Sequence, residues 1–372
     1  MRNPTPLFNR MQKSMRVFTP GRSLTALLIL MIPASPAIAF DEAGLRFEHG
    51  DWAVSCDNTR TCRVDGYQSD EGKQPPVSVL LTRVAGAGQA VKGELTLGNY
   101  DEDEAAAKSR PKTFALTMTI DGKSLGSVGM QADEMHGTLS EAQVTALIAS
   151  LARKSGIAWS YGGKTWRLSS NGGAAVLLKM DEAQGRLDTR GALIRKSTAS
   201  EEHVLPALPK PVVVAVKPID QDESEKRLSP AESKSLRTAL LASIKPDDCP
   251  EPTEHPAETG MSVARLDARK QVASMVCWRG AYQSSGSYWL TNRKPPWNPV
   301  LVADSGTDYN DGEINSALKG RGLGDCWSTE TWTWDGSAFV HTASATSGMC
   351  KLVAAGGAWD LPTIVTDVRH AK

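Results

Sequence analysis

Cys326 and His341 are the residues of this chain whose types could form a thiol nucleophile and its base. The competing interpretation is that Cys326 forms a disulfide bond, and the number of cysteines favours it. The chain has an even set of six, namely Cys56, Cys62, Cys249, Cys277, Cys326 and Cys350. In a chain that folds in an oxidising compartment, such a set favours disulfides over catalysis or metal binding.

The first 39 residues predict that oxidising compartment. They carry five basic and no acidic side chains, run apolar from Leu24 to Ile32, and end in the small-x-small sequence Ala37-Ile38-Ala39. This pattern is typical of a signal peptide that is removed after export. Its apolar stretch is about half of the ~20 residues that a membrane span requires, and no longer one follows. We therefore expect a periplasmic or secreted protein with no transmembrane segment in the mature chain.

The pairing of the six cysteines can be predicted from the elements around them, although six cysteines permit fifteen connectivities. Cys56 and Cys62 end two short strands joined by a polar turn. Cys326 and Cys350 flank a hairpin that turns at Asp335-Gly336, which would bring them within disulfide distance. The remaining pair, Cys249–Cys277, would tie a helix to the following strand. A Cys277–Cys326 bond, or a free thiol at Cys326, would contradict this assignment.

A glycine-rich run from Gly320 to Trp327 holds the best candidate for a ligand site. Its glycines permit close approach of a ligand to the backbone, and Arg321 could hold an anionic group. Asp325 and Trp327 complete the candidate site. The alternative, which we favour, is that the Arg321–Asp325 pair only braces a turn.

Other polar clusters do not make a convincing site. The segment Asp304–Glu313 is oxygen-rich, but its spacing does not fit an EF-hand, which favours an Asx-rich turn. Asp181, Glu182, Arg186 and Asp188 are interpreted as a solvated face, since charge clusters are usually on the surface. The six histidines show no metal-ligand spacing. We therefore expect no catalytic residue, metal site or cofactor.

The charge and aromatic content of the mature chain limit the classes of partner that we expect. Removal of the leader leaves 333 residues, and the loss of its five basic residues changes the balanced charge of the whole chain to −5. A mildly acidic protein lacks the basic patch that nucleic acid requires. Ten tryptophans are many for this length. We expect most to lie in the core, and the alternative is a surface on which sugars or peptides stack.

The fold class follows from the periodicity. Residues 40–197 predict a β-rich N-terminal domain, with alternating strands such as 52–56, 62–67 and 113–120, a helix capped by Ser140, and a second helix within 171–187. Residues 198–228, rich in proline and charge, predict an extended linker. Residues 229–372 predict a tryptophan-rich, disulfide-bonded β domain with a helix capped by Ser229. The expected fold is mainly β (β-rich α+β), with two antiparallel-sheet domains and a few packed helices.

Several runs in the second half resemble a known family. They are Cys277-Trp278-Arg279-Gly280-Ala281-Tyr282, the run from Gly320 to Trp327, Trp332–Gly336 and Gly357–Pro362. Together they resemble a family of exported bacterial proteins known as domain of unknown function 1176. Through Trp52, Cys56, Cys62 and the strands and helix that end at Arg195, the first half also resembles the invasion-associated locus B proteins. The resemblance implies an envelope or secreted location and no established activity.

The function expected from the sequence is that of a soluble exported envelope protein that binds an unidentified envelope protein or ligand without catalysis. The alternative is a hydrolase that acts on an envelope polymer in a tryptophan-lined groove of the C-terminal domain. A pocket that gathers two acidic groups would favour the enzyme, whereas a flat aromatic face would favour binding.

Overall fold

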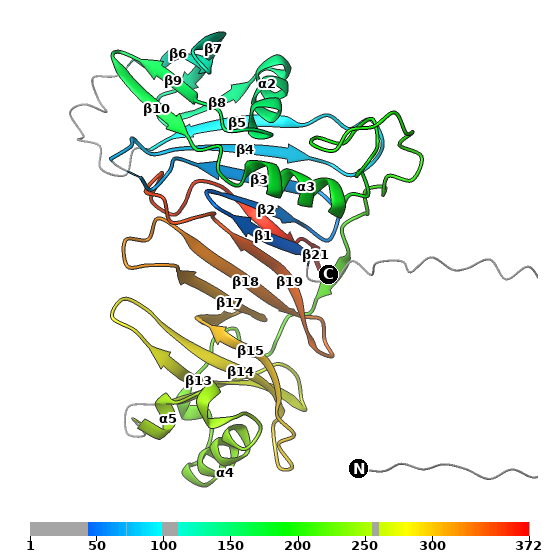
Figure 1. Ribbon diagram of the computed structural model, residues 1–372. Coiled ribbons are helices and arrows are strands. Elements are labelled where there is room, and N and C mark those ends of the chain that lie inside the picture. Colours follow the sequence, from blue (N-terminus) through cyan, green and yellow to red (C-terminus); the bar gives the residue numbers. More distant parts are fainter. Residues whose placement is uncertain (1–43, 72, 99–110, 255–259, 372) are drawn as a thin grey trace, which may run out of the picture. The chain divides into compact units, whose positions relative to one another are not determined.

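The computed structural model describes residues 44–71, 73–98, 111–254 and 260–371, all of which belong to one compact unit. The predicted signal peptide lies outside the described residues. The protein is mainly β, with antiparallel sheets as predicted (Figure 1). No described helix combines the length and the apolar character needed to cross a bilayer.

A ten-stranded antiparallel sheet contains most of the N-terminal half. Its order is β1-β2-β3-β4-β5-β8-β7-β6-β9-β10. The strands are β1 (Leu45–His49), β2 (Trp52–Cys56), β3 (Cys62–Tyr67), β4 (Val77–Arg83), β5 (Lys92–Leu97), β6 (Thr113–Ile120), β7 (Lys123–Gln131), β8 (His136–Leu139), β9 (Ile157–Tyr161) and β10 (Lys164–Leu168). Alternate residues of β6 are buried, which is the pattern expected where one face of a sheet is covered.

Two helices pack on this sheet. Helix α2 (Glu141–Leu151) begins at the predicted capping box, in which Ser140 and Gln143 exchange side-chain and backbone hydrogen bonds. It contacts β5 and β6, whereas α3 (Gly173–Ala183) contacts β1, β2 and β3 (Figure 1). Their buried stripes join Trp52, Trp159 and Trp166 in one hydrophobic core.

Two smaller sheets contain most of the C-terminal half. One has four antiparallel strands, β12 (Met261–Arg265), β13 (Lys270–Arg279), β14 (Ser284–Asn292) and β15 (Val300–Gly306). The other has five, β16 (Asp308–Asn310), β17 (Glu313–Lys319), β18 (Trp327–Trp334), β19 (Phe339–Thr346) and β20 (Leu361–Ile364). Side chains from both sheets, including Tyr288 and Trp334, share one core.

Short helices cover the four-stranded sheet. Helix α4 (Pro230–Leu241) begins at the predicted Ser229 capping box and packs Leu236 and Leu240 against Trp289 and Trp297. It is preceded by the 3₁₀ turn η1 (Glu225–Arg227), and η2 (Pro246–Asp248) and α5 (Glu251–Glu254) follow it. These elements give the second half a core of its own.

Residues 198–228 differ from the extended linker that the sequence predicts. They contain β11 (Val212–Ala215), which pairs in parallel with β21 (Asp367–His370). Asp220 is buried and forms an ion pair with Arg265 at 2.8 Å. The proline-rich linker and the division into two domains are therefore not confirmed.

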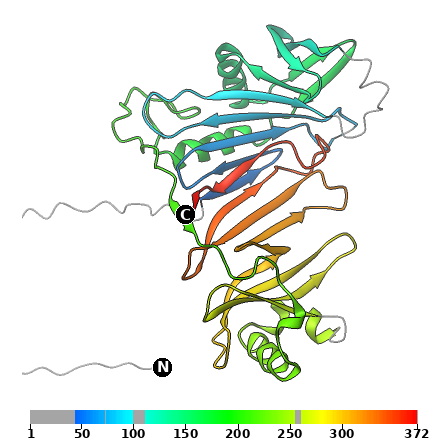
Figure 2. The same cartoon turned by 180° about the vertical axis from the view of Figure 1, so that it is seen from behind.

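Direct hydrogen bonds join residues on opposite sides of segment 198–228. Strand β20 contacts β2 (Figures 1 and 2). Trp359 Nε1 donates to Ser78 Oγ at 2.7 Å, and Lys351 Nζ lies 3.0 Å from Asp51 Oδ1. Met349 N donates to the hydroxyl of Tyr67 at 3.2 Å. The first strands of the chain and its last hundred residues thus share a polar contact.

The cysteines form the three predicted pairs. The Cα atoms are 3.9 Å apart in Cys56–Cys62, 4.3 Å in Cys249–Cys277 and 4.8 Å in Cys326–Cys350. Cys56 and Cys62 lie opposite each other in the register of β2 and β3. Cys326 and Cys350 lie at the open end of the β18–β19 hairpin, as the position of its turn predicts.

Two predictions about the C-terminal half need correction. The segment Asp304–Glu313 is part of β15, β16 and the start of β17, and the turn is confined to Asp311-Gly312, where both residues have positive φ. The run from Val365 to Val368 also predicts a strand that closes the sheet, but these residues do not form one strand. Instead β20 ends at Ile364 and pairs with β19, and β21 starts at Asp367 and pairs with β11.

Candidate functional site

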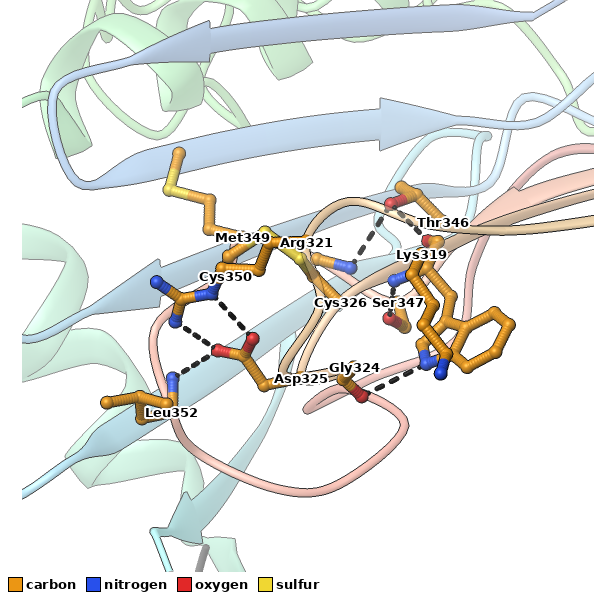
Figure 3. Close-up of a disulfide and its surroundings, with 12 residues drawn as sticks. Lys319, Arg321, Gly324, Asp325, Cys326, Thr346, Ser347, Met349, Cys350 and Leu352 are labelled. Carbon is orange, nitrogen blue, oxygen red and sulfur yellow. Dashed lines mark hydrogen bonds and ion pairs between the residues drawn. A yellow bond between two sulfur atoms is a disulfide. The ribbon is translucent and has the colours of Figure 1, made fainter. Parts of the chain in front are cut away.

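The glycine-rich segment 320–326 connects β17 to β18 and packs on the Cys326–Cys350 disulfide (Figure 3). Gly320 is needed for this close approach, because a Cβ atom there would lie 2.7 Å from Cys326 Sγ. Gly324 has a φ of +70°, which favours glycine. The glycines therefore bring the backbone close to protein atoms, which leaves no need to invoke a ligand.

The predicted pair Arg321–Asp325 is a brace inside this segment. Asp325 is buried and accepts hydrogen bonds from Arg321 Nε at 2.7 Å, Arg321 Nη2 at 2.5 Å and Leu352 N at 2.8 Å (Figure 3). The hydrogen bonds from Arg321 lower the pKa of Asp325. Since a bidentate carboxylate already occupies Arg321, the structure agrees with the bracing alternative for these two residues.

The chain brings Asp325 close to Cys326 and Cys350, the one set of potential metal-binding side chains that gathers within the described part of the chain. Both sulfur atoms belong to a disulfide, and a disulfide offers no thiolate to a metal ion. His341 does not approach Cys326 as a base would. It stacks on Trp332 with ring centroids 4.7 Å apart, and burial lowers its pKa.

Trp327, the third predicted site residue, lines a groove with Trp359. The groove has a volume of about 330 Å³. It is formed by β18, the end of β19 and the segment before β20, and it is lined by Trp327, Thr329, Ala345, Thr346, Ser347, Gly356, Trp359 and Asp360. We call it the Trp327–Trp359 groove. Trp359 was not among the predicted site residues, although the sequence run that contains it is one of those that mark the family.

Both indoles of the groove are held in place by hydrogen bonds. Trp327 Nε1 donates to the carbonyl oxygen of Gly324 at 3.0 Å, and Trp359 Nε1 donates to Ser78 Oγ at 2.7 Å. Ser347 links their backbones, because its Oγ accepts from Trp327 N and its carbonyl oxygen accepts from Trp359 N. The polar edge of each ring is thus bonded to the protein, which fixes the apolar faces before any ligand arrives.

The tryptophans as a group are mostly core residues, as predicted. Trp52, Trp159, Trp166, Trp289, Trp297 and Trp334 are buried. The other four are partly or well exposed, and these are Trp278, Trp327, Trp332 and Trp359. Of these, Trp327 and Trp359 share a groove, whereas Trp278 does not line that groove.

The prediction that residues 181–188 form a solvated face is wrong for two of the four charged residues. Glu182 and Asp188 are exposed, but Asp181 and Arg186 are fully buried. Arg186 forms an ion pair with Glu201 at 2.9 Å, and Asp181 lies 3.6 Å from Arg83. Burial raises the pKa of Asp181. Periodicity could not reveal this, because the charges are compensated by residues distant in sequence.

A second hollow, of about 260 Å³, is lined by residues outside the predicted sites. Glu223 lies in it, with Ser274 Oγ 2.8 Å from one carboxylate oxygen and 3.0 Å from the other. Burial raises the pKa of Glu223, and burial together with this carboxylate raises the pKa of the buried Tyr288. We call it the Glu223 pocket. A second acid, Glu225, also lines this pocket. Neither glutamate was among the predicted site residues, because both lie in the predicted linker.

These features define a β-rich protein with three disulfides and a small aromatic groove. The chain belongs to the family described as protein of unknown function DUF1176, which matches residues 46–366. It is similar to the uncharacterized protein YpfG of Escherichia coli strain K12, with 26% identity over 336 residues, 84% of this chain and 90% of that protein. No solved structure matches the chain. The similarity of the first half to invasion-associated locus B proteins is not shown.

Proposed function

We propose that this protein is an exported, non-catalytic binding protein of the cell envelope, and that its Trp327–Trp359 groove holds a sugar ring of an envelope glycan. The observation that carries the proposal is the pair of indoles fixed by their own Nε1 hydrogen bonds. The electron-rich face of an indole attracts the positively polarised C–H groups of a sugar ring. Rigid rings lose little conformational freedom on binding.

The polar residues of the groove suit the same ligand. Thr329 and Asp360 are exposed residues that line the groove. A hydroxyl and a carboxylate there can bond the hydroxyl groups at the edge of a stacked sugar. A peptide ligand is less favoured, because a shallow groove with so few backbone partners would leave its amide groups without hydrogen bonds.

Export to the envelope is supported by the leader pattern and the cysteines. The first 39 residues carry the charge and apolar pattern of a signal peptide. The described residues contain three disulfides and no free cysteine, which suits an oxidising compartment.

The test is binding of the mature chain to insoluble peptidoglycan and to a soluble tetramer of N-acetylglucosamine. We expect Trp327→Ala and Trp359→Ala each to weaken binding by about tenfold or more, which corresponds to a loss of ~1.4 kcal/mol. Trp359→Phe keeps a ring but removes the bond to Ser78, so it should bind better than Trp359→Ala. Trp278→Ala is the matched control, since Trp278 is exposed outside the groove. Equal binding by all four variants, or saturable binding by none of the proteins, would overturn the proposal.

The second candidate function, a hydrolase of an envelope polymer, is favoured by the Glu223 pocket. A carboxyl group with a raised pKa can act as a general acid. However, a glycoside hydrolase requires a second carboxyl group across the substrate, and Glu225, only two residues away in the chain, is exposed. Release of reducing ends from the same glycans by the native chain, abolished in Glu223→Gln, would establish the hydrolase and contradict a purely binding role.

A further inference from the structure

A third hollow lies in the N-terminal half and shares no lining residue with either site above. It has a volume of about 570 Å³ and is formed by α2, the chain before β5 and the segment 190–196. Its apolar part consists of Val91, Val144, Ile148 and Leu193. We call it the Arg190 pocket, after one of the cations that line it. Its size is within the range of pockets that hold small molecules, ~300–1,000 Å³.

The apolar wall of the pocket continues into the main core. Val144 and Ile148 lie four residues apart on α2, on one face of the helix, and both belong to the hydrophobic core cluster. Val91 and Leu193 are partly buried and pack against that cluster. An apolar ligand chain placed here would therefore touch side chains that the core already holds in position.

The charged lining is predominantly cationic. Arg190 and Lys196 are exposed, and neither side chain forms a hydrogen bond or ion pair with another described residue. Arg83 also lines the pocket, and the one acid among the lining residues is Glu141. Three cations facing one carboxylate favour an anionic ligand.

The side chain of Arg83 is held in a fixed position beside the pocket. Its side chain is only 6% exposed and is fixed by Nε to the carbonyl oxygen of Gln89 at 2.9 Å and by Nη1 to that of Gly191 at 2.8 Å. Its Nη2 makes no hydrogen bond to a described residue. Burial, with the nearby charge of Arg186, lowers the pKa of Arg83 to about 10. Asp181, which lies 3.6 Å away, and Glu201 offset part of the effect of burial on Arg83.

We propose that the Arg190 pocket binds a small amphiphile with one anionic head group and an apolar chain. The head group lies among Arg190, Lys196 and Nη2 of Arg83, and the chain lies along Val91, Val144, Ile148 and Leu193. A carboxylate or a phosphate satisfies the same cations, so a fatty acid and a singly acylated phospholipid share this chemistry. This site and its ligand are independent of the Trp327–Trp359 groove.

The test is calorimetric titration of the mature, disulfide-bonded chain with four probes below their micelle concentrations. The probes are decanoate, decyl phosphate, decanol and acetate. We expect saturable binding of decanoate or decyl phosphate, and at least tenfold weaker binding of decanol and acetate, which lack the charge or the chain. Tighter binding of decanoate identifies a carboxylate ligand, and tighter binding of decyl phosphate identifies a phosphate ligand. Decanol binding as tightly as both anions, or no saturable binding of any probe, would overturn the proposal.

Variants locate the site. Arg190→Ala with Lys196→Ala should weaken binding of the anionic probe about tenfold or more, whereas Arg167→Ala with Lys123→Ala removes the same charge from exposed positions outside the pocket and should not. Thr145→Trp should fill the pocket from the exposed side of α2, and Ala142→Trp is its control on the same helix. Thermal unfolding of each variant shows that it is folded. Unchanged affinity in both pocket variants would contradict the site, whatever the result for the Trp327–Trp359 groove.

Discussion

At the scale of single residues, the most unusual group is Asp65 in β3. Its side chain is fully buried, and one carboxylate oxygen accepts a hydrogen bond from the hydroxyl of Tyr67 at 2.8 Å. The other oxygen has no hydrogen-bond partner among the described residues. Burial raises the pKa of Asp65 to about 6 from an ordinary value of 3.8. The folded protein therefore favours the neutral acid, since a buried carboxylate without full compensation is costly.

This shift makes stability depend on pH in a defined direction. Below pH ~4 Asp65 is protonated in both states and contributes nothing. Between pH ~4 and ~6 the unfolded chain ionises while the folded one keeps its proton, so the free energy of unfolding falls as pH rises. Above pH ~6 Asp65 is ionised in both the folded and the unfolded state. The loss in the free energy of unfolding then stays constant, at about 3 kcal/mol for a shift of this size.

We predict that Asp65→Asn, which has the same shape but cannot ionise, removes this penalty. The variant should be about 2–3 kcal/mol more stable than the native chain at pH 8 and nearly equal at pH 4, measured by urea unfolding across that range. Comparison of the two proteins cancels the titration of other groups. A difference in stability that stays constant from pH 4 to pH 8 would show that Asp65 does not titrate in this interval.

At the scale of elements, the β18–β19 hairpin carries most of the candidate site. Trp327 is its first residue, and Cys326–Cys350 closes its open end. The brace formed by Arg321 and Asp325 then connects this end to Leu352. The shape of the groove therefore depends on a disulfide and on the ion pair between the exposed Arg321 and the buried Asp325, none of which lines the groove.

We predict that Cys326→Ala with Cys350→Ala lowers the free energy of unfolding by roughly 3 kcal/mol, as expected for a closed loop of this length, and weakens glycan binding as well. Cys56→Ala with Cys62→Ala is the control, because it removes a disulfide that closes a much shorter loop. The control should cost less stability and leave glycan binding unchanged. Equal loss of binding in both variants would mean that the groove is not shaped by its own disulfide.

Most elements could be predicted from the sequence, and the failures have physical causes. Helices with capping boxes and strands with alternating burial, such as β6, carry local signals. Strand β8 has only four residues and is ordered by its neighbours in the sheet, and β11 is ordered by pairing with β21, far away in sequence. Trp327 was predicted as a site residue, but its partner Trp359 joins it through a bond to Ser78 that no local pattern indicates.

At the scale of the whole molecule, the question is whether segment 198–228 separates two independent halves. Tyr67, Ser78 and Asp51, which precede this segment, form hydrogen bonds with residues 349–359, which follow it. Asn58 also exchanges two hydrogen bonds with Val365. These contacts oppose free movement of the halves, although their polar character leaves each half with its own hydrophobic core.

We predict that the halves stay together when the connection is cut. A specific protease site inserted between Pro209 and Lys210, in an exposed stretch, permits a single cleavage. The two fragments should elute together in gel filtration and separate only in denaturant. Elution as two separate folded fragments would instead confirm the two-domain layout with a linker.

The bonds between the first strands and the last hundred residues join parts of the chain that are synthesised at different times. A ribosome releases β3 long before Met349, whose backbone amide binds Tyr67 from 282 positions further along the chain. Until residues 349–359 have been synthesised, the side chains of Asp51, Tyr67 and Ser78 lack these hydrogen-bond partners. A message shortened by thirty codons would therefore yield a protein without Met349, Lys351 and Trp359, and so without the bonds that these residues make to the first strands.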